Sequence, residues 1–173
     1  MCIETERLIL RPHTPADFED YFGYIMDREL QRLLGLNGVV DRESALETFQ
    51  WLLDNVEFLA VVSRETGRII GHICIEPPVE QVARASEFQG QKGASLTFAI
   101  VRAEQRKGLM LEALTALIGQ RFREGAVDYF DCEYQADNAA SRGLQEKLGF
   151  RYWGTGQFGD VELIINVLRN PTS

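Results

Sequence analysis

The stretch of sequence that decides the fold is residues 94–114, ASLTFAIVRAEQRKGLMLEAL. It begins with a strand-like run, continues through a short polar turn with two cations and a glycine, and ends in apolar residues at helical spacing. A turn that leads directly into a helix leaves the first backbone N–H groups of that helix without partners, at the positive end of its dipole. We therefore predict that this turn can bind a phosphate group.

The patterns on either side of this stretch predict one mixed α/β domain that spans residues 1–173. Helices are expected at 14–35 with a break near Asp27, at 41–56, at 109–124 and at 137–148. Strands are expected at 6–11, 58–63, 68–75, 94–101, 127–134, 150–153 and 161–167. The order β-α-α-β-β-β-α-β-α-β-β predicts a largely antiparallel sheet with one βαβ unit around the central turn.

Local signals sharpen several of these elements. Thr14 and Asp17 form a capping-box pattern at the first helix, Asp41 is placed to cap the second, and Pro12 is expected to end the first strand. Residues 79–93 are polar with little pattern, which favours an insertion that acts as a lid. The stripe predicted to pack into the core from the second helix is Ala45, Leu46, Phe49, Leu52, Leu53 and Val56.

Composition excludes several classes of protein. The formal net charge of −8 argues against nucleic acid as a partner and is compatible with a cationic substrate such as an amine. No apolar run is long enough to span a membrane, and the N-terminus lacks a signal-peptide pattern, so we expect a cytoplasmic protein. Cys2, Cys74 and Cys132 are widely spaced, so neither a disulfide framework nor a metal site is expected.

A second motif, NAASRGLQEKLGF, occupies residues 138–150, roughly 30 residues beyond the central turn. With QRKGLM at 105–110 and this order of elements, the chain resembles the GNAT superfamily of acyl-CoA-dependent N-acetyltransferases. The opening TERLILR, at 5–11, is similar to the start of the branch that includes ribosomal-protein-alanine N-acetyltransferases. The resemblance runs from Thr5 to about Leu168.

The resemblance implies a GNAT fold whose sheet is splayed at the central strand, with acetyl-CoA in a V-shaped opening beside that strand. It assigns the pantetheine amides to the backbone around Phe98, Ile100 and Val101, and a contact with the cofactor arm to Asn138. It assigns the pyrophosphate to the backbone N–H groups of the central turn, at Gln105, Arg106, Lys107, Gly108, Leu109 and Met110.

Two residues depart from the family pattern in the central turn. The last small residue of the Gln/Arg-x-x-Gly-x-Gly/Ala pattern is Met110 here, and that side chain either crowds the cofactor or points away. Many members have glycine at the position of Arg106, which here either contributes charge to the phosphates or is solvated.

The family chemistry needs a proton for the leaving thiolate. Many relatives supply it from a tyrosine seven positions after the motif asparagine, but this position is Gln145. The ribosomal-protein branch has serine three positions after the asparagine, so the resemblance makes Ser141 the general acid; the alternative is a serine that caps or packs in the first helical turn.

The base is left open between Glu133, His72 and water without a dedicated residue. Glu133 is favoured, acting through water, while His72 in an apolar strand is more typical of a core histidine. His13, beside Pro12, is interpreted as a surface residue.

The sequence therefore predicts an enzyme that transfers an acetyl group from acetyl-CoA to a primary amine by direct attack. The amine is a protein N-terminus or a small molecule, and a homodimer is left open. The alternative is a non-catalytic acyl-CoA-binding or protein-interaction module on the same fold.

Overall fold

A computed structural model describes residues 2–36 and 38–171. Its internal contacts divide the chain into two compact units. The first unit comprises residues 1–74 and 98–113, and the second comprises 75–97 and 114–173. The expectation of a single domain stays a prediction.

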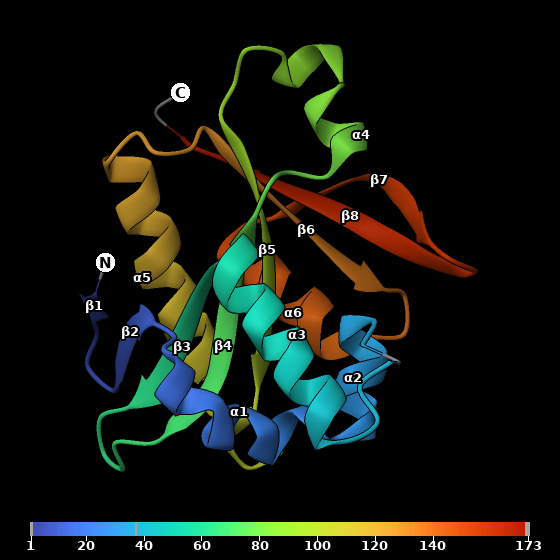
Figure 1. Cartoon of the computed structure of the whole chain (residues 1–173). Coiled ribbons are helices and arrows are strands. Elements are labelled where there is room, and N and C mark those ends of the chain that lie inside the picture. The colour runs from blue at the N-terminus through green and yellow to red at the C-terminus, as the bar shows by residue number, and fades with distance from the viewer. Residues whose placement is uncertain (1, 37, 172–173) are drawn as a thin grey trace. The chain divides into compact units, whose positions relative to one another are not determined.

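The strands follow the order β1-β2-β3-β4-β5-β6-β8-β7 by hydrogen bonding (Figure 1). The pair β5–β6 is parallel, and α5 (Leu109–Arg123) connects its strands, which confirms the predicted βαβ unit. The pairs β1–β2, β2–β3, β6–β8 and β7–β8 are antiparallel, so the predicted mixed α/β class is confirmed. The strands are β1 (Ile3–Glu4), β2 (Leu8–Pro12), β3 (Glu57–Ser63), β4 (Ile69–Glu76), β5 (Gly93–Ile100), β6 (Tyr129–Gln135), β7 (Arg151–Phe158) and β8 (Val161–Arg169).

The first unit is built on an aromatic core beneath three helices, α1 (Phe18–Ile25), α2 (Arg28–Leu34) and α3 (Arg42–Asn55). Tyr21 of α1 lies between α3 and the sheet, with its ring centroid 4.9 Å from that of Phe49 and 6.0 Å from that of Phe58. Such tilted and edge-to-face pairs stabilise a core beyond the area they bury. The core therefore fixes α1 and α3 against β3.

The predicted helix starts are confirmed by hydrogen bonds. The Asp17 carboxylate accepts from the Thr14 backbone N–H at 2.7 Å, and Asp41 Oδ1 accepts from the Ser44 N–H at 2.9 Å. Asp27, where a break was expected, caps α2. The predicted α3 stripe is wrong at Leu46, which is 38% exposed, because α3 turns this position toward solvent.

The second unit contains a structured excursion where the sequence predicted a segment of little pattern. Residues 77–92 carry the short helix α4 (Glu80–Ala83) and a 3-10 turn at Ser86–Phe88. Val82 and Phe88 are buried in a cluster with Tyr129, and the Trp153 indole N–H donates to Glu87 at 2.8 Å. The predicted insertion is therefore present between β4 and β5, and its few apolar residues build a small core of their own. Its role as a lid stays a prediction.

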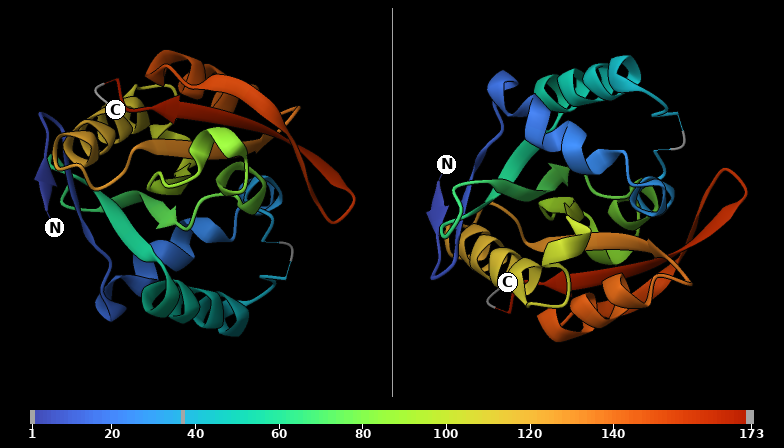
Figure 2. Two further views of the ribbon diagram at one scale, coloured as in Figure 1. Left: turned by 90° about the horizontal axis from the view of Figure 1, so that it is seen from above. Right: turned by 90° about the horizontal axis from the view of Figure 1, so that it is seen from below.

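The two last strands are longer than predicted. The sequence ended the first of them at Trp153, but β7 continues to Phe158 and includes Gly154 and Gly156. A register shift between Tyr152 and Gly154 absorbs the irregularity, and the turn falls at Gly159, whose φ is +59°. Figure 2 shows the β7–β8 hairpin as a long two-stranded ribbon.

The N-terminal strands also differ from the prediction. The short strand β1 was missed, and it pairs with β2 through Ile3–Leu10 and Glu4–Ile9. Pro12 ends β2 as expected, and it is the last paired residue of this strand, opposite Leu59. A proline lacks an N–H group and is tolerated at a strand end, where one missing donor costs little.

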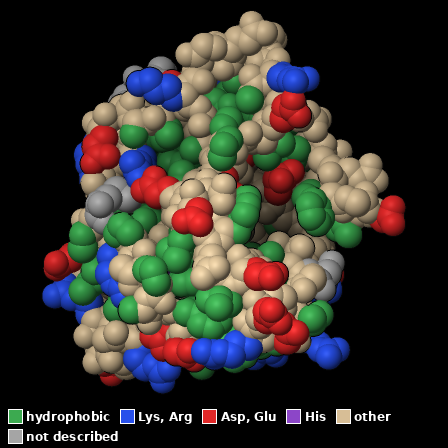
Figure 3. Space-filling model, viewed as in Figure 1, with side chains coloured by type: hydrophobic (Ala, Val, Ile, Leu, Met, Phe, Trp, Pro, Cys, Tyr) green, Lys and Arg blue, Asp and Glu red, His purple; other side chains and the backbone are tan. Residues whose placement is uncertain are grey.

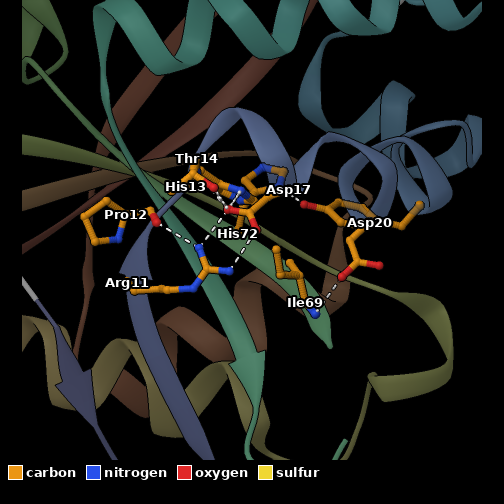
Figure 4. Close-up of polar contacts among 9 residues, drawn as sticks. Arg11, Pro12, His13, Thr14, Asp17, Asp20, Ile69 and His72 are labelled. Atoms are coloured by element: carbon orange, nitrogen blue, oxygen red, sulfur yellow. Dashed lines mark hydrogen bonds and ion pairs between the residues drawn. The ribbon is translucent and has the colours of Figure 1, made fainter. Parts of the chain in front are cut away.

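His13 is buried, which corrects its interpretation as a surface residue. Its ring is stacked 4.1 Å from the Phe58 ring, and within the described residues neither ring nitrogen has a hydrogen-bond partner. Burial lowers its pKa from 6.5 to about 4. In the neighbouring contacts of Figure 4, Arg11 donates two hydrogen bonds to Asp17, at 2.7 and 2.8 Å.

We predict that His13→Phe makes the protein less sensitive to acid. Because the folded-state pKa is about 4, the unfolded chain binds a proton between pH 6.5 and 4 that the native chain does not. The free energy of unfolding therefore decreases by up to about 3 kcal/mol as the pH is lowered through this range. Phenylalanine keeps the stacking and removes two buried polar atoms without partners, so stability at pH 7 should be equal or higher.

Urea unfolding at pH 7 and pH 5 tests this expectation. Wild type should lose more stability than His13→Phe between the two values. An equal loss in both proteins, or a variant that is destabilised by more than 2 kcal/mol at pH 7 (roughly the cost of a core defect), would contradict it.

Candidate functional site

The turn at residues 105–110, hereafter the 105–110 turn, combines two left-handed residues. Arg106 has a φ of +64° and Gly108 a φ of +77°, and among the described residues Arg106 is the sole non-glycine residue with a positive φ. A left-handed residue next to right-handed ones turns successive N–H groups toward the same side, which makes an anion-binding concavity. The residues from Gln105 to Gly108 are exposed.

Helix α5 begins directly after this turn. The Glu112 N–H donates to the Gly108 carbonyl at 3.0 Å. The N–H groups of Gly108, Leu109 and Met110 precede that bond and have no hydrogen-bond acceptor among the described residues. The turn therefore offers several backbone donors at the positive end of a 15-residue helix.

One carboxylate ties the N-terminal motif to the start of α5. Glu112 accepts hydrogen bonds from the Thr5 hydroxyl at 2.6 Å and from the backbone N–H of Arg7 at 2.9 Å, and it pairs with the Arg7 guanidinium at 2.7 Å. Arg7 Nη1 also donates to the Lys107 carbonyl at 3.1 Å. Partial burial opposes ionisation, but these donors outweigh it and lower the pKa of Glu112.

Two of the predicted residues in the turn point into the protein. Leu109 and Met110 are buried, Met110 being 5% exposed. The side chain of Met110 is therefore held in the interior and does not project from the exposed face of the turn. Lys107 Nζ pairs with Glu104 at 2.9 Å.

The end of β5 carries the predicted backbone contacts at Phe98, Ile100 and Val101. The Val101 N–H already donates to the Ile70 carbonyl of β4, at 2.8 Å. A Cβ atom on Gly71 would lie 2.2 Å from the Ala99 carbonyl oxygen, so β4 approaches this part of β5 closely. Phe98 and Ile100 are half-buried.

In the second unit, the asparagine motif opens α6 (Ala139–Leu148). Asn138 is its N-cap, and Asn138 Oδ1 accepts from the Ser141 backbone N–H at 3.0 Å. Gly149 ends the helix with a φ of +93°. Ser141 lies in the first turn and is half-buried, and its Oγ contacts the side-chain nitrogen of Gln145 at 3.1 Å.

Glu133 lies on β6 among other acidic groups. Burial raises the pKa of its carboxyl, and the nearby charge of Glu76 raises it further. Glu76 Oε2 accepts from the Thr97 hydroxyl at 3.1 Å, and Glu133 Oε1 lies close to Gly156, where an added Cβ atom would be 3.0 Å from it.

Asp131 is an acidic residue that the sequence reasoning missed. It is fully buried, and burial raises the pKa of its carboxyl to about 7. Asp131 Oδ2 accepts from the Val79 N–H at 3.0 Å, while Oδ1 has no hydrogen-bond partner among the described residues. The alternation of Tyr129, Asp131 and Glu133 along one face of a strand was the available signal.

His72 fits the core alternative. It is buried on β4, its Nδ1 lies 2.9 Å from the Tyr24 hydroxyl, and burial lowers its pKa to about 3. Such a group accepts a proton poorly near neutral pH.

The predicted residues thus fall into two groups. Phe98 to Met110 lie together in the first unit, and Glu133, Asn138 and Ser141 lie in the second. On the face shown in Figure 3, acidic and basic side chains are scattered among exposed hydrophobic ones. Across residues 2–36 and 38–171, no cluster of three or more His, Cys, Asp or Glu side chains is arranged to hold a metal ion, and no helix is long and apolar enough to cross a membrane.

Comparison with known families covers most of the chain. Residues 7–151 match the acetyltransferase (GNAT) domain model. The chain belongs to the GNAT acetyltransferase family. Two curated relatives agree, both 26% identical to this chain. An N-acetyltransferase 9-like protein of Caenorhabditis briggsae aligns over 86% of this chain and 77% of its own length. The uncharacterized N-acetyltransferase YoaA of Bacillus subtilis aligns over 88% and 84%.

Solved structures share the GNAT fold at low sequence identity. A GNAT acetyltransferase from Bacillus anthracis has a TM-score of 0.82 at 19% identity, covering 98% of this chain and 99% of its own. The ribosomal L7/L12 acetyltransferase RimL, solved in complex with coenzyme A, has a TM-score of 0.79 at 16% identity over both whole chains. A ribosomal-protein-S5-alanine acetyltransferase from Vibrio fischeri has a TM-score of 0.74 at 16%, covering 99% and 97%.

We predict opposite tolerance at the two left-handed positions of the 105–110 turn. Gly108→Ala should cost about 1–2 kcal/mol, since alanine is strained at positive φ. The cost is conformational, because an added Cβ atom would meet one arginine nitrogen at 3.8 Å. Arg106→Gly should stay within about 0.5 kcal/mol of wild type, as relief of strain offsets the greater freedom of the unfolded chain.

Chemical denaturation of both variants measures the difference. A Gly108→Ala protein as stable as Arg106→Gly would contradict the left-handed geometry of the turn.

Proposed function

We propose that this GNAT enzyme transfers an acetyl group from acetyl-CoA to a primary amine. The observation that supports this proposal is the 105–110 turn. This turn exposes backbone N–H groups at the start of the long helix α5, and it contains the family motif QRKGLM. The coenzyme-A-bound structure of RimL is consistent with this choice of donor.

In this proposal the 105–110 turn binds the pyrophosphate. The donors are the N–H groups from Arg106 to Met110, because the Gln105 N–H already donates to the Arg102 carbonyl at 3.3 Å. Gly108 allows close approach of the main chain. Because the Met110 side chain is buried, the departure from a small residue at this position does not block the exposed face of the turn. Arg106 is exposed and adds a positive charge beside it.

The pantetheine arm would pair with the backbone of β5 and contact Asn138. The Val101 N–H donates to Ile70, and the Val101 carbonyl accepts from the Glu104 N–H at 2.9 Å, so the pairing falls to the polar groups at Phe98 and Ile100. The side-chain oxygen of Asn138 caps α6, so its amide nitrogen is the group offered to the arm.

Ser141 acts as the general acid. The amine nitrogen attacks the thioester carbon, the C–S bond breaks, and the Ser141 hydroxyl supplies a proton to the leaving thiolate. Ser141 lies in the first turn of α6, beside the cap formed by Asn138. A fixed position of this kind suits a group that must deliver a proton to the thiolate sulfur.

Glu133 acts as the base, directly or through water. A neutral amine is the nucleophile, so the ammonium form of the acceptor must lose a proton. A carboxylate whose pKa is raised by burial and by Glu76 is a stronger base than an exposed glutamate.

The acceptor is a primary amine, and the carboxylates of Glu76 and Glu133 favour its cationic form on approach. A protein N-terminus and a small-molecule amine both satisfy this chemistry. The second candidate, an acyl-CoA-binding module without turnover, is favoured by Gln145 at the position where many relatives have a tyrosine acid.

We predict that Ser141→Ala lowers kcat by at least tenfold, the low end of the effect of general acids. The KM for acetyl-CoA should change by less than about threefold, since the lost proton acts on the transition state. Thiol release with a panel of amines measures both constants. Ser86→Ala, at an exposed serine in the 3-10 turn, is the matched control. Unchanged kcat in Ser141→Ala removes Ser141 as the acid, and absence of turnover in wild type with every amine favours the binding module.

We predict that Glu133→Gln removes the acidic limb of the pH profile of kcat/KM. A raised pKa means that Glu133 becomes protonated, and inactive as a base, at a higher pH than an ordinary glutamate. Wild-type activity should therefore decline as the pH falls through that raised value. Asp131→Asn is the control, because Asp131 also titrates at a raised pKa on the same strand. If the acidic limb is lost in Asp131→Asn and kept in Glu133→Gln, Glu133 is not the base.

A further inference from the structure

The fully buried side chain of Gln145 joins α6 to β6 and β8. Its Nε2 donates to Ser141 Oγ at 3.1 Å and to Cys132 Sγ at 3.1 Å. Its Oε1 accepts from Asn166 Nδ2 at 3.0 Å. Gln145 and Asn166 are both buried, so the bonds between these two amides are shielded from bulk solvent, while Ser141 is half-buried.

The orientation of the Asn166 amide sets the direction of these bonds. An amide nitrogen donates and an amide oxygen accepts, so the Asn166 nitrogen requires the Gln145 oxygen to face β8. The Gln145 nitrogen must then face Ser141 and Cys132. Burial raises the pKa of the Cys132 thiol, so the sulfur stays protonated and accepts only weakly.

Ser141 is thereby placed as an acceptor toward Gln145. A hydroxyl carries one proton, and a bond accepted from Gln145 leaves that proton to point elsewhere. If Gln145 presented its oxygen instead, Ser141 would donate to it, and the proton would be held inside the network.

We propose that Gln145 is a positioning residue that keeps the Ser141 hydroxyl oriented as a proton donor, with Asn166 setting the orientation of Gln145. The proposal rests on the role of Ser141 as general acid. It explains how a glutamine at this position serves the same reaction: it acts on the serine and not on the substrate.

The proton balance supports this role. As the C–S bond breaks, the Ser141 proton moves to the thiolate sulfur, and negative charge develops on Ser141 Oγ. The Gln145 N–H stabilises that charge through the bond already present. Ser141 then recovers a proton released by the amine, so the network ends the cycle unchanged.

Two substitutions reverse the orientation with little change in volume. Gln145→Glu places a carboxylate, which accepts but does not donate, against Ser141. Asn166→Asp presents an acceptor to Gln145. The Gln145 nitrogen then turns toward β8, and the Gln145 oxygen faces Ser141. Gln145→Met is the packing control, since it fills the same space and neither holds the Ser141 proton nor donates strongly to Ser141.

The experiment measures kcat, the KM for acetyl-CoA and urea stability for these three variants, for Ser141→Ala and for the double variant Ser141→Ala/Gln145→Glu. We expect Gln145→Glu and Asn166→Asp to lower kcat at least tenfold at pH 8, with KM within about threefold of wild type. The ratio of Gln145→Glu to wild type should rise as the pH falls, because a protonated glutamic acid can donate to Ser141 again. Gln145→Met should retain more activity than Gln145→Glu, and the double variant should be no slower than Ser141→Ala.

The outcomes separate the two proposals. If Ser141→Ala keeps wild-type kcat, the general-acid role fails, and the positioning role fails with it. If Ser141→Ala is slow while folded Gln145→Glu and Asn166→Asp keep wild-type kcat, the positioning role alone is overturned. A Gln145→Glu loss that is constant with pH, equal to that of Gln145→Met, or additive with Ser141→Ala indicates a structural role and also overturns it.

Discussion

The Glu112 carboxylate lies one turn into α5 and binds three donors from residues 5–7, at the other end of the first unit's sequence. The same Arg7 side chain donates to the Lys107 carbonyl. One arginine–carboxylate pair, Arg7 with Glu112, therefore joins residues 5–7 to the 105–110 turn. Without this pair the first turn of a helix would fray, since its N–H groups have no helical partners. The anion-binding geometry proposed for the turn therefore depends on residues about one hundred positions away.

In the second unit, the proposed general acid Ser141 is held by buried neutral groups. The Asn138 cap fixes the backbone of Ser141, and the Gln145 amide fixes the hydroxyl. A carboxylate in place of Gln145 would be costly in this buried site, whereas an amide hydrogen-bonds with Ser141, Cys132 and Asn166 without a charge. In the acidic groups of this unit, Asp131 and Glu133, burial raises the pKa toward neutrality.

Periodicity and capping patterns predicted most of the fold because they are local. Asp17, Asp27 and Asp41 lie where the helices begin, and Gly149 lies where α6 ends. Features decided by distant contacts escaped prediction. His13 is a surface residue by its sequence neighbours, yet it stacks on Phe58. The 77–92 segment is polar, but Val82 and Phe88 suffice to anchor it beside Tyr129. For the candidate site, the motifs located the turn and Ser141, whereas the Gln145 network joins three elements and has no signature in sequence spacing.

In the proposed function, the 105–110 turn binds the pyrophosphate of acetyl-CoA through backbone N–H groups. The most direct test is to titrate the ¹⁵N-labelled protein with acetyl-CoA and with S-acetylpantetheine, which carries the thioester and lacks the pyrophosphate. We predict large amide shifts at Gly108, Leu109 and Met110 with acetyl-CoA and not with S-acetylpantetheine. The dissociation constant should be at least tenfold higher for S-acetylpantetheine, which corresponds to a loss of more than about 1.4 kcal/mol of binding free energy. Equal affinities for the two ligands, with amides 108–110 unmoved by acetyl-CoA, would contradict the account.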